Sequence, residues 1–127
     1  AAFADATDRR VRDLVVVVLD KPRHAKLVAD IREAGATLRL VAEGDVACAV
    51  SAASGGVDFV LGIGGTPEGI VAAFAVRALG GFLTGRLAPQ TSEQETAAHA
   101  AGPDLKRILE LGDLVSSDSV LFVSTPI

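Results

Sequence analysis

The chain has 127 residues and a net charge of −4, and half of its residues are hydrophobic. This length corresponds to one domain, and the apolar content is enough for one core. The acidic balance and the absence of Trp and Tyr argue against a nucleic-acid binder. No apolar run approaches the roughly 20 residues of a membrane span, and nothing resembles a signal peptide. Because Cys48 is the single cysteine, an internal disulfide is excluded, and we expect a cytoplasmic protein.

Short β-branched runs alternate with helical patterns along the chain. The first run, residues 14–19, is apolar on both faces, which is typical of a strand in a parallel sheet that helices cover. This alternation predicts an α/β fold with a mainly parallel sheet and flanking helices. The predicted strands are 14–19, 37–42, 57–61, 82–87 and 120–123. The predicted helices are 23–34, 45–53, 68–79 and 105–109, with 90–101 as either a polar surface helix or a mobile insertion.

Helical spacing also predicts which side chains face the core. In helix 68–79 these are Ile70, Val71, Phe74 and Ala75, and helix 23–34 is expected to stop at Gly35. No second domain is visible, so residues 1–127 are interpreted as a single α/β domain. The chain opens without Met and ends beside an apolar run, and we therefore expect it to be a piece of a longer protein.

Three loops follow predicted strands directly and lead into predicted helices: residues 20–24, 43–45 and 62–69. In open α/β sheets, ligands bind at the carboxyl ends of the strands, where helix N-termini gather. We therefore expect the three loops to open on the same edge of the sheet.

The third loop, Gly62-Ile-Gly-Gly-Thr-Pro-Glu-Gly69, carries the strongest signal. Its glycines allow close backbone approach, and a helix that begins at Pro67 with Thr66 as N-cap offers N–H groups that suit a phosphate. It lacks the third glycine of a dinucleotide fingerprint and the Lys of a P-loop. Because the Glu68 carboxylate would repel a phosphate, a divalent cation between them is favoured. A tight turn with an ordinary cap explains these residues equally well.

The first loop places Lys21 and Arg23 on either side of Pro22. Cations at a helix N-terminus oppose the helix dipole, so this pair indicates an anionic ligand. The alternative is a solvated basic turn.

The second loop places carboxylates on either side of Gly44. Glu43 and Asp45 could accept hydrogen bonds from sugar hydroxyls, although helix capping is the stronger interpretation from these residues alone. His24 and His99 lie in separate regions and indicate no zinc site, and Cys48 is interpreted as a small core residue.

These loop sequences, in this order and spacing, resemble the class II fructose-1,6-bisphosphatases, some relatives of which also hydrolyse sedoheptulose 1,7-bisphosphate. The resemblance runs from about Leu14 to Val123 and departs from the family at Glu43, where Asp is usual. The motifs that carry it are Asp20-Lys-Pro-Arg-His24, Glu43-Gly-Asp45-Val46, Gly62-Ile-Gly-Gly-Thr-Pro-Glu-Gly69, Gly85-Arg-Leu87 and Gly112-Asp-Leu-Val115.

The resemblance implies the C-terminal half of the lithium-sensitive phosphatase fold and removal of the 1-phosphate from a sugar bisphosphate with Mn²⁺ or Mg²⁺. By the same resemblance, catalytic residues are expected in the N-terminal half, so the isolated 127-residue chain should be inactive, and a homo-oligomer is expected. Matching positions imply Glu68 as a metal ligand and, as substrate contacts, Lys21, Pro22, Arg23, Glu43, Gly44, Asp45 and Gly65.

A different class of function fits the same loops. A non-catalytic nucleotide- or sugar-phosphate-binding module would also use a parallel sheet and a glycine loop. Titration with NADH against fructose 1,6-bisphosphate separates the two interpretations.

Overall fold

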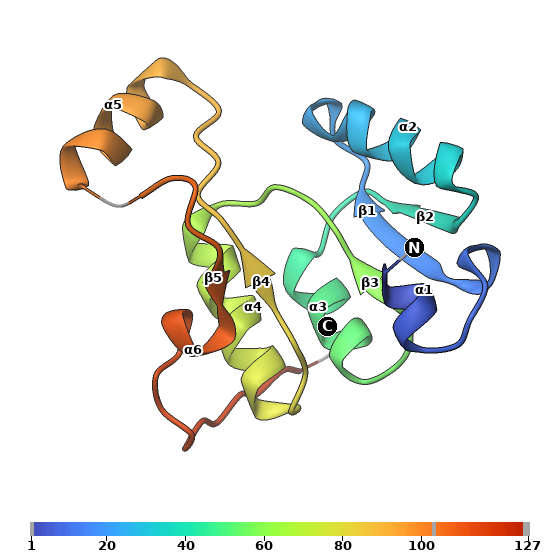
Figure 1. Cartoon of the computed structure of the whole chain (residues 1–127). Coiled ribbons are helices and arrows are strands. Elements are labelled where there is room, and N and C mark those ends of the chain that lie inside the picture. Colours follow the sequence, from blue (N-terminus) through green and yellow to red (C-terminus); the bar gives the residue numbers. More distant parts are fainter. Residues whose placement is uncertain (1, 103, 126–127) are drawn as a thin grey trace.

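The computed structural model describes residues 2–102 and 104–125. Its larger sheet is parallel and three-stranded, in the order β2-β1-β3, and is made of Thr37–Val41, Val15–Leu19 and Phe59–Val60 (Figure 1). A second, antiparallel sheet pairs β4 (Thr84–Gly85) with β5 (Leu109–Glu110). The helices are α1 (Ala2–Ala6), α2 (Ala25–Ala34), α3 (Asp45–Ala53), α4 (Thr66–Ala78), α5 (Ser92–Ala101) and α6 (Leu111–Leu114), with 3₁₀ turns η1 (Val11–Asp13) and η2 (Pro22–His24). Within those described ranges no helix has the length and apolarity to cross a membrane.

Strand β1 is the centre of the larger sheet. Its last four residues are buried, and Val18 has no exposed surface. β1 pairs in parallel with β2, from Val15 opposite Thr37 onward, and with β3 on its other edge. A strand flanked on both edges and covered on its faces needs a continuous apolar run, which the four consecutive valines supply. The predicted parallel sheet is therefore confirmed for its first three strands.

Helix α2 covers one face of this sheet. Its Ile31 is buried against Val16 and Val18, and Leu27 packs on the same cluster. The helix begins after η2, two residues later than predicted. It stops as predicted, because Gly35 adopts a left-handed φ of 81° and donates its N–H to Arg32 O at 3.0 Å.

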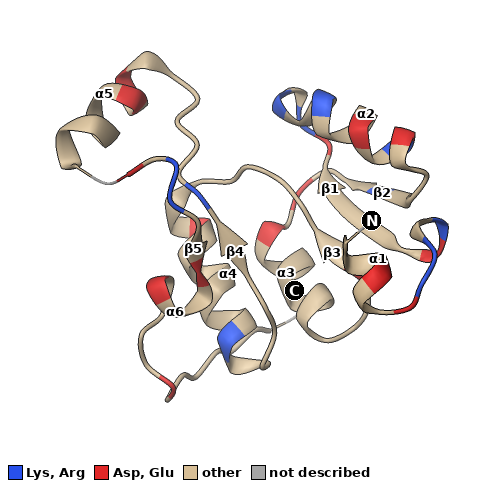
Figure 2. Ribbon diagram, viewed as in Figure 1, with Lys and Arg blue, Asp and Glu red and all other residues tan. Residues whose placement is uncertain are grey.

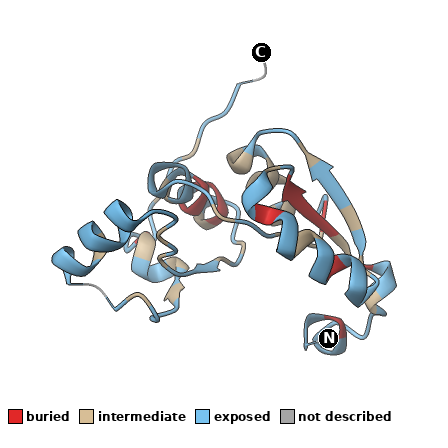
Figure 3. Ribbon diagram, turned by 90° about the horizontal axis from the view of Figure 1, so that it is seen from above, coloured by how far each residue is buried: buried red, intermediate tan, exposed pale blue. Residues whose placement is uncertain are grey.

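Helices α3 and α4 pack against each other, and α3 also contacts β3. Figure 3 shows burial concentrated in the central strand and in part of α4. The predicted inward face of α4 is wrong at Val71 and Phe74, which are 46% and 40% exposed. Small residues allow two helices to approach most closely, and α4 therefore presents alanines instead: the buried residues are Ala72, Ala73, Ala75 and Val76.

The predicted strand 82–87 is confirmed only at Thr84–Gly85, and its expected place in the parallel sheet is wrong. Only Thr84–Gly85 is extended with a partner, and it pairs antiparallel with Leu109–Glu110 in the separate sheet. The predicted helix 105–109 is wrong for the same region, because Leu109 belongs to β5. Asp104 Oδ1 also accepts the Lys106 N–H at 2.9 Å, a turn that competes with a helical start.

Two predictions for the polar and C-terminal segments have opposite outcomes. Ser92–Ala101 is a helix, α5, whose Thr91 side chain caps it by accepting the Gln94 N–H, so the surface-helix interpretation is confirmed. Figure 1 shows α5 projecting away from the larger sheet. The predicted strand 120–123 is wrong: this described segment pairs with no strand, and Leu121 is 87% exposed.

The amino ends of β1 and β3 are held by the segment that precedes β1. Asp58, just before β3, accepts the Val15 N–H at 2.7 Å and forms an ion pair with Arg9. Phe3 of α1, a helix with no counterpart in the prediction, packs edge-on against Phe59 with ring centroids 4.3 Å apart. These contacts fix the N-terminal segment to the sheet.

Asp58→Ala tests this anchor. The variant leaves the Val15 amide without its acceptor, a loss of about 1–3 kcal/mol in the free energy of unfolding, so the melting temperature should fall by several degrees. Asp30→Ala is the matched control, because Asp30 forms only the exposed pair with Lys26. Equal melting temperatures for the two variants would contradict the anchor.

The same carboxylate predicts a pH dependence. The hydrogen bond from Arg9, followed by that from the Val15 amide, holds the pKa of Asp58 below its ordinary value. A lowered pKa means that the carboxylate stabilises the fold above the ordinary value of about 3.9 and that this stability is lost as the pH falls further. The melting-temperature difference between wild type and Asp58→Ala should therefore shrink below about pH 4.

Candidate functional site

The three strand-to-helix loops meet at one edge of the parallel sheet. Strands β1, β2 and β3 all end there, so the loops that begin after Leu19, Val41 and Val60 share that edge. The Asp20 N–H donates to Val41 O at 2.8 Å, and the Leu61 N–H donates to Val17 O at 3.0 Å. The ladder thus continues past the strand ends and fixes where each loop starts.

The first and third loops are joined at Ile63. Arg23 Nε donates to Ile63 O at 2.7 Å, and the Ile63 N–H donates to His24 Nε2 at 2.8 Å. Gly62 lies against the His24 ring, where a Cβ would come within 3.1 Å of Cε1. Two consecutive residues of the first loop therefore hold both polar backbone atoms of one residue of the third.

The second loop reaches the third through Asp45. A Cβ at Gly64 would come 2.9 Å from Asp45 Oδ2, so the glycine leaves room for this carboxylate. Gly44, the N-cap of α3, has a φ of 105°, which other residues rarely adopt. Glu43, on the other side of Gly44, is exposed, and Asp45 is half-buried. Both predicted carboxylates of this loop are thus at the shared edge.

The start of α4 differs from the prediction by one residue. Gly65 is the N-cap and Thr66 the first helical residue, so the predicted Thr66 cap is wrong. A side chain at Gly65 would collide with Glu68 Oε2, so the Glu68 carboxylate lies over the helix start. This N-terminus has no side-chain cap, and backbone N–H groups of its first turn remain to bind an acceptor.

The first loop is the basic part of the edge. Lys21 is half-buried and is the N-cap of η2, Pro22 is its first residue, and Arg23 is exposed. In the part of the chain that the structure describes, neither Lys21 nor Arg23 forms a salt bridge, whereas Lys26 pairs with Asp30 at 2.7 Å. Figure 2 shows Lys and Arg gathered where α2 begins, and an acidic residue at the start of α3.

The acidic residues of this edge are too few for a complete metal centre. Over residues 2–102 and 104–125, no group of three or more His, Cys, Asp or Glu is placed to hold a metal ion. At this edge the Glu68 carboxylate stands at the start of α4 without such a group around it among the described residues.

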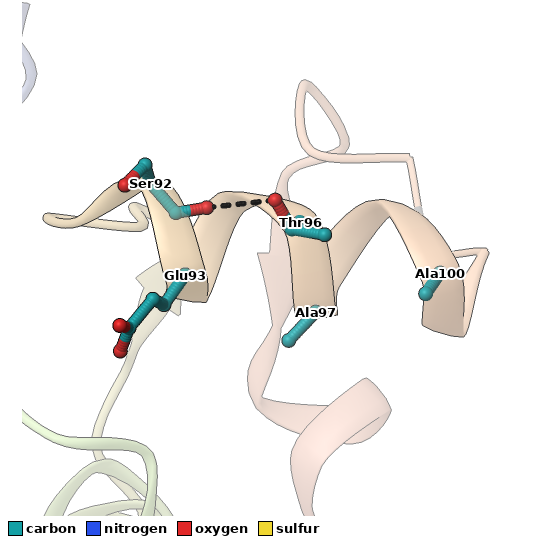
Figure 4. Close-up of a pocket in the computed structure, with 5 residues that line it drawn as sticks. All are labelled: Ser92, Glu93, Thr96, Ala97 and Ala100. Carbon is teal, nitrogen blue, oxygen red and sulfur yellow. Dashed lines mark hydrogen bonds between the residues drawn. The ribbon is translucent and has the colours of Figure 1, made fainter.

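The hollow in Figure 4 lies away from the three loops. Its lining comes from one face of α5, and the Thr96 hydroxyl there donates to the Ser92 carbonyl at 2.9 Å. A surface that one helix forms alone provides no convergent polar groups, so this hollow is not the candidate site.

His24 has buried contacts in the first loop that sequence reasoning missed. It is 1% exposed, the one polar side chain among the described residues that is buried. Its partners are backbone atoms of Leu19 and Ile63, and no spacing of side-chain types in the sequence marks such contacts. Its position two residues after Pro22, in the loop that follows an apolar strand, is the only signal.

The position of Asp45 can be tested through Cys48. Burial, followed by the charge of Asp45, raises the pKa of the Cys48 thiol, so less thiolate is present than in an exposed cysteine. Asp45→Asn should increase the rate of iodoacetamide alkylation at pH 8, and Glu43→Gln, the control, should not. Mass spectrometry of the intact chain measures the rate. An unchanged rate in Asp45→Asn would place the carboxylate away from the Cys48 thiol.

Comparisons with known proteins show which family this chain belongs to. Residues 1–127 match the family described as bacterial fructose-1,6-bisphosphatase, glpX-encoded. Three curated relatives are named D-fructose 1,6-bisphosphatase class 2/sedoheptulose 1,7-bisphosphatase. Those of Trichodesmium erythraeum (strain IMS101) and Microcystis aeruginosa (strain NIES-843 / IAM M-2473) are 37% identical to this chain, and that of Crocosphaera subtropica (strain ATCC 51142 / BH68) is 36% identical.

Each alignment covers 96% of this chain and 40% of the relative. The chain thus spans less than half the length of these relatives. The match over all of its residues confirms the resemblance that its loop motifs carry, and the chain belongs to the glpX-encoded bacterial fructose-1,6-bisphosphatase family.

Proposed function

We propose that this chain is the substrate-binding half of a metal-dependent sugar bisphosphatase, and that the whole protein removes the 1-phosphate of fructose 1,6-bisphosphate. The observation that carries the proposal is the meeting of three charged loops, two of which contain glycine, at one sheet edge in a chain of this family. The 40% coverage of the relatives supports placing the catalytic groups outside these 127 residues.

Lys21 and Arg23 hold the phosphate that stays on the sugar. Arg23 uses its Nε–H on Ile63 O, which orients the guanidinium and leaves its two Nη groups for a bidentate grip on the anion. Lys21 adds a point charge, and Pro22 fixes the backbone between them. These cations also have no carboxylate partner among the described residues, so an anion meets no competitor.

Glu43 and Asp45 accept hydrogen bonds from sugar hydroxyls. Gly44 turns the chain sharply between them through its positive φ, so the two carboxylates stand on either side of the turn. Gly65 contributes its backbone at the uncapped start of α4, where an N–H group can donate to a phosphate oxygen.

Glu68 contributes one ligand to a divalent cation, Mn²⁺ or Mg²⁺. Such a cation, when bound, polarises a phosphate and lowers the pKa of a bound water. Mg²⁺ takes six ligands, several of them water, and the proposal therefore needs further carboxylates from the longer protein. The role of Glu68 within this chain is to hold negative charge at the α4 N-terminus, beside the phosphate oxygens.

The proposal also covers the fold, the compartment and the oligomeric state of the whole protein. The fold of the whole protein is that of the lithium-sensitive phosphatases, and its compartment is the cytoplasm, where the free Cys48 stays reduced. Homo-oligomer formation is part of the proposal by family resemblance.

Thermal unfolding of the chain with ligands tests the site directly. Fructose 1,6-bisphosphate with Mn²⁺ at about 100 times its Kd should add roughly 2.7 kcal/mol to the free energy of unfolding. Arg23→Ala should remove most of this gain, and Arg32→Ala, an exposed arginine at the far end of α2, should keep it. Stabilisation by NADH instead of the bisphosphate would favour a nucleotide-binding module.

In the longer protein, Arg23→Ala should lower kcat/KM for fructose 1,6-bisphosphate by about 100-fold, mostly through a higher KM, because contacts to the phosphate that stays on the sugar are equally strong in the ground state and the transition state. Arg32→Ala again serves as the control. An unchanged kcat/KM in Arg23→Ala would contradict the phosphate-binding role.

Glu68→Gln tests the metal ligand. The amide keeps the size of the side chain and removes its charge, so the Mn²⁺ concentration for half-maximal activity of the longer protein should rise by about tenfold or more. Glu33→Gln, on the exposed side of α2, is the control. Identical Mn²⁺ titrations for both variants would remove Glu68 from the metal centre.

A further inference from the structure

The ring of His24 has a defined tautomer. Nδ1 lies 2.8 Å from Leu19 O and Nε2 lies 2.8 Å from the Ile63 backbone nitrogen. A carbonyl oxygen can only accept and an amide N–H can only donate, so Nδ1 carries the hydrogen and Nε2 offers its lone pair. The ring is therefore neutral, with both nitrogens satisfied, at a position where 1% of the residue is exposed.

These two bonds join the carboxyl ends of two neighbouring strands. Leu19 is the last residue of β1, and Ile63 lies three residues after β3 ends at Val60. The glycine segment 62–65 has no side chains of its own to hold it, apart from Ile63, and it leads directly into α4. The contacts of Ile63 therefore tie the segment that leads into Gly65 and α4 to the first loop.

From this geometry we infer that His24 is a positioning residue of the phosphate site: it holds the Ile63 amide so that Arg23 and the start of α4 face the same substrate. The inference rests on the proposed function and goes beyond it, because His24 does not touch the substrate. Arg23 takes its orientation from Ile63 O, so a displaced Ile63 would also turn the guanidinium. The close approach of Gly62 to the ring, 3.1 Å for an added Cβ, leaves no room for the loop to shift toward His24.

Two variants separate positioning from simple burial. The amide oxygen of Gln lies at the distance of Nε2, so His24→Gln keeps an acceptor for the Ile63 N–H and loses the bond to Leu19 O. The amide nitrogen of Asn lies at the distance of Nδ1, so His24→Asn keeps the donor to Leu19 O and loses the acceptor for Ile63. Each variant gives up one buried hydrogen bond, and both should lower the melting temperature to a similar extent.

The inference predicts that the two variants lose similar amounts of stability but differ in their affinity for the bisphosphate. Affinity for fructose 1,6-bisphosphate in Mn²⁺ buffer should stay within about threefold of wild type in His24→Gln. It should fall by about tenfold or more in His24→Asn, because a displaced Ile63 removes one contact to the phosphate. Calorimetric titration of each variant with fructose 1,6-bisphosphate measures this affinity. Equal affinities in the two variants would overturn the positioning role.

Two measurements do not depend on bisphosphate binding. Hydrogen exchange of the Ile63 amide should be slow in wild type and His24→Gln and fast in His24→Asn. A long-range ¹H–¹⁵N spectrum of wild type should show the hydrogen on Nδ1, and a hydrogen on Nε2 would overturn the inference even if neither variant folds. If wild type binds no bisphosphate while exchange follows the expected order, the proposed ligand fails and the positioning of the loop by His24 stands.

Discussion

Parallel pairing of β1 between β2 and β3 is the constraint on which the rest of the molecule depends. Parallel neighbours cannot be joined by a tight turn, so the chain must cross over the sheet between each pair, through α2 and then α3. Each crossover starts at the same edge. The meeting of charged loops is therefore a consequence of strand direction, and the loop residues only decide what chemistry that edge offers.

The two ends of β1 are held in different ways, and the difference suits a ligand site. At the amino end, the Val15 amide is held by a carboxylate that is itself paired with Arg9. At the carboxyl end, the structural contact is made by the neutral His24 ring. A neutral connector there leaves the nearby cations uncommitted, and a carboxylate in the same place would neutralise them. Charged side chains thus stabilise the fold at the amino end of β1, whereas those at its carboxyl end remain available to a ligand.

The sequence predicted what depends on local pattern. Four consecutive valines predicted a buried strand of a parallel sheet, the bounds of α3 were predicted correctly, and Gly35 ends α2 as expected. The predictions failed where the outcome depends on distant partners. Residues 82–87 and 120–123 have strand-like composition, but which edge they meet is decided by residues far along the chain. The inward face of α4 was misjudged because the helix is apolar nearly all round, so its packing on Ala-rich α3 decides its rotation. The loops of the site were predicted from their order after the strands, whereas His24 acts through backbone atoms and leaves no pattern to read.

The glycines of the third loop restrict which substitutions relatives of this chain can accept. The space beside Gly64 is filled by the Asp45 carboxylate, and the space beside Gly65 is filled by the Glu68 carboxylate. A side chain added at either glycine would compete with an acidic group that belongs to another position. Substitutions are therefore not independent: a larger residue at 64 is compatible with a shorter one at 45, and positions 65 and 68 are linked in the same way. Across the family, positions 45 and 64 should change together, as should positions 65 and 68. Where a relative lacks the carboxylate, larger residues should occur in place of the glycine.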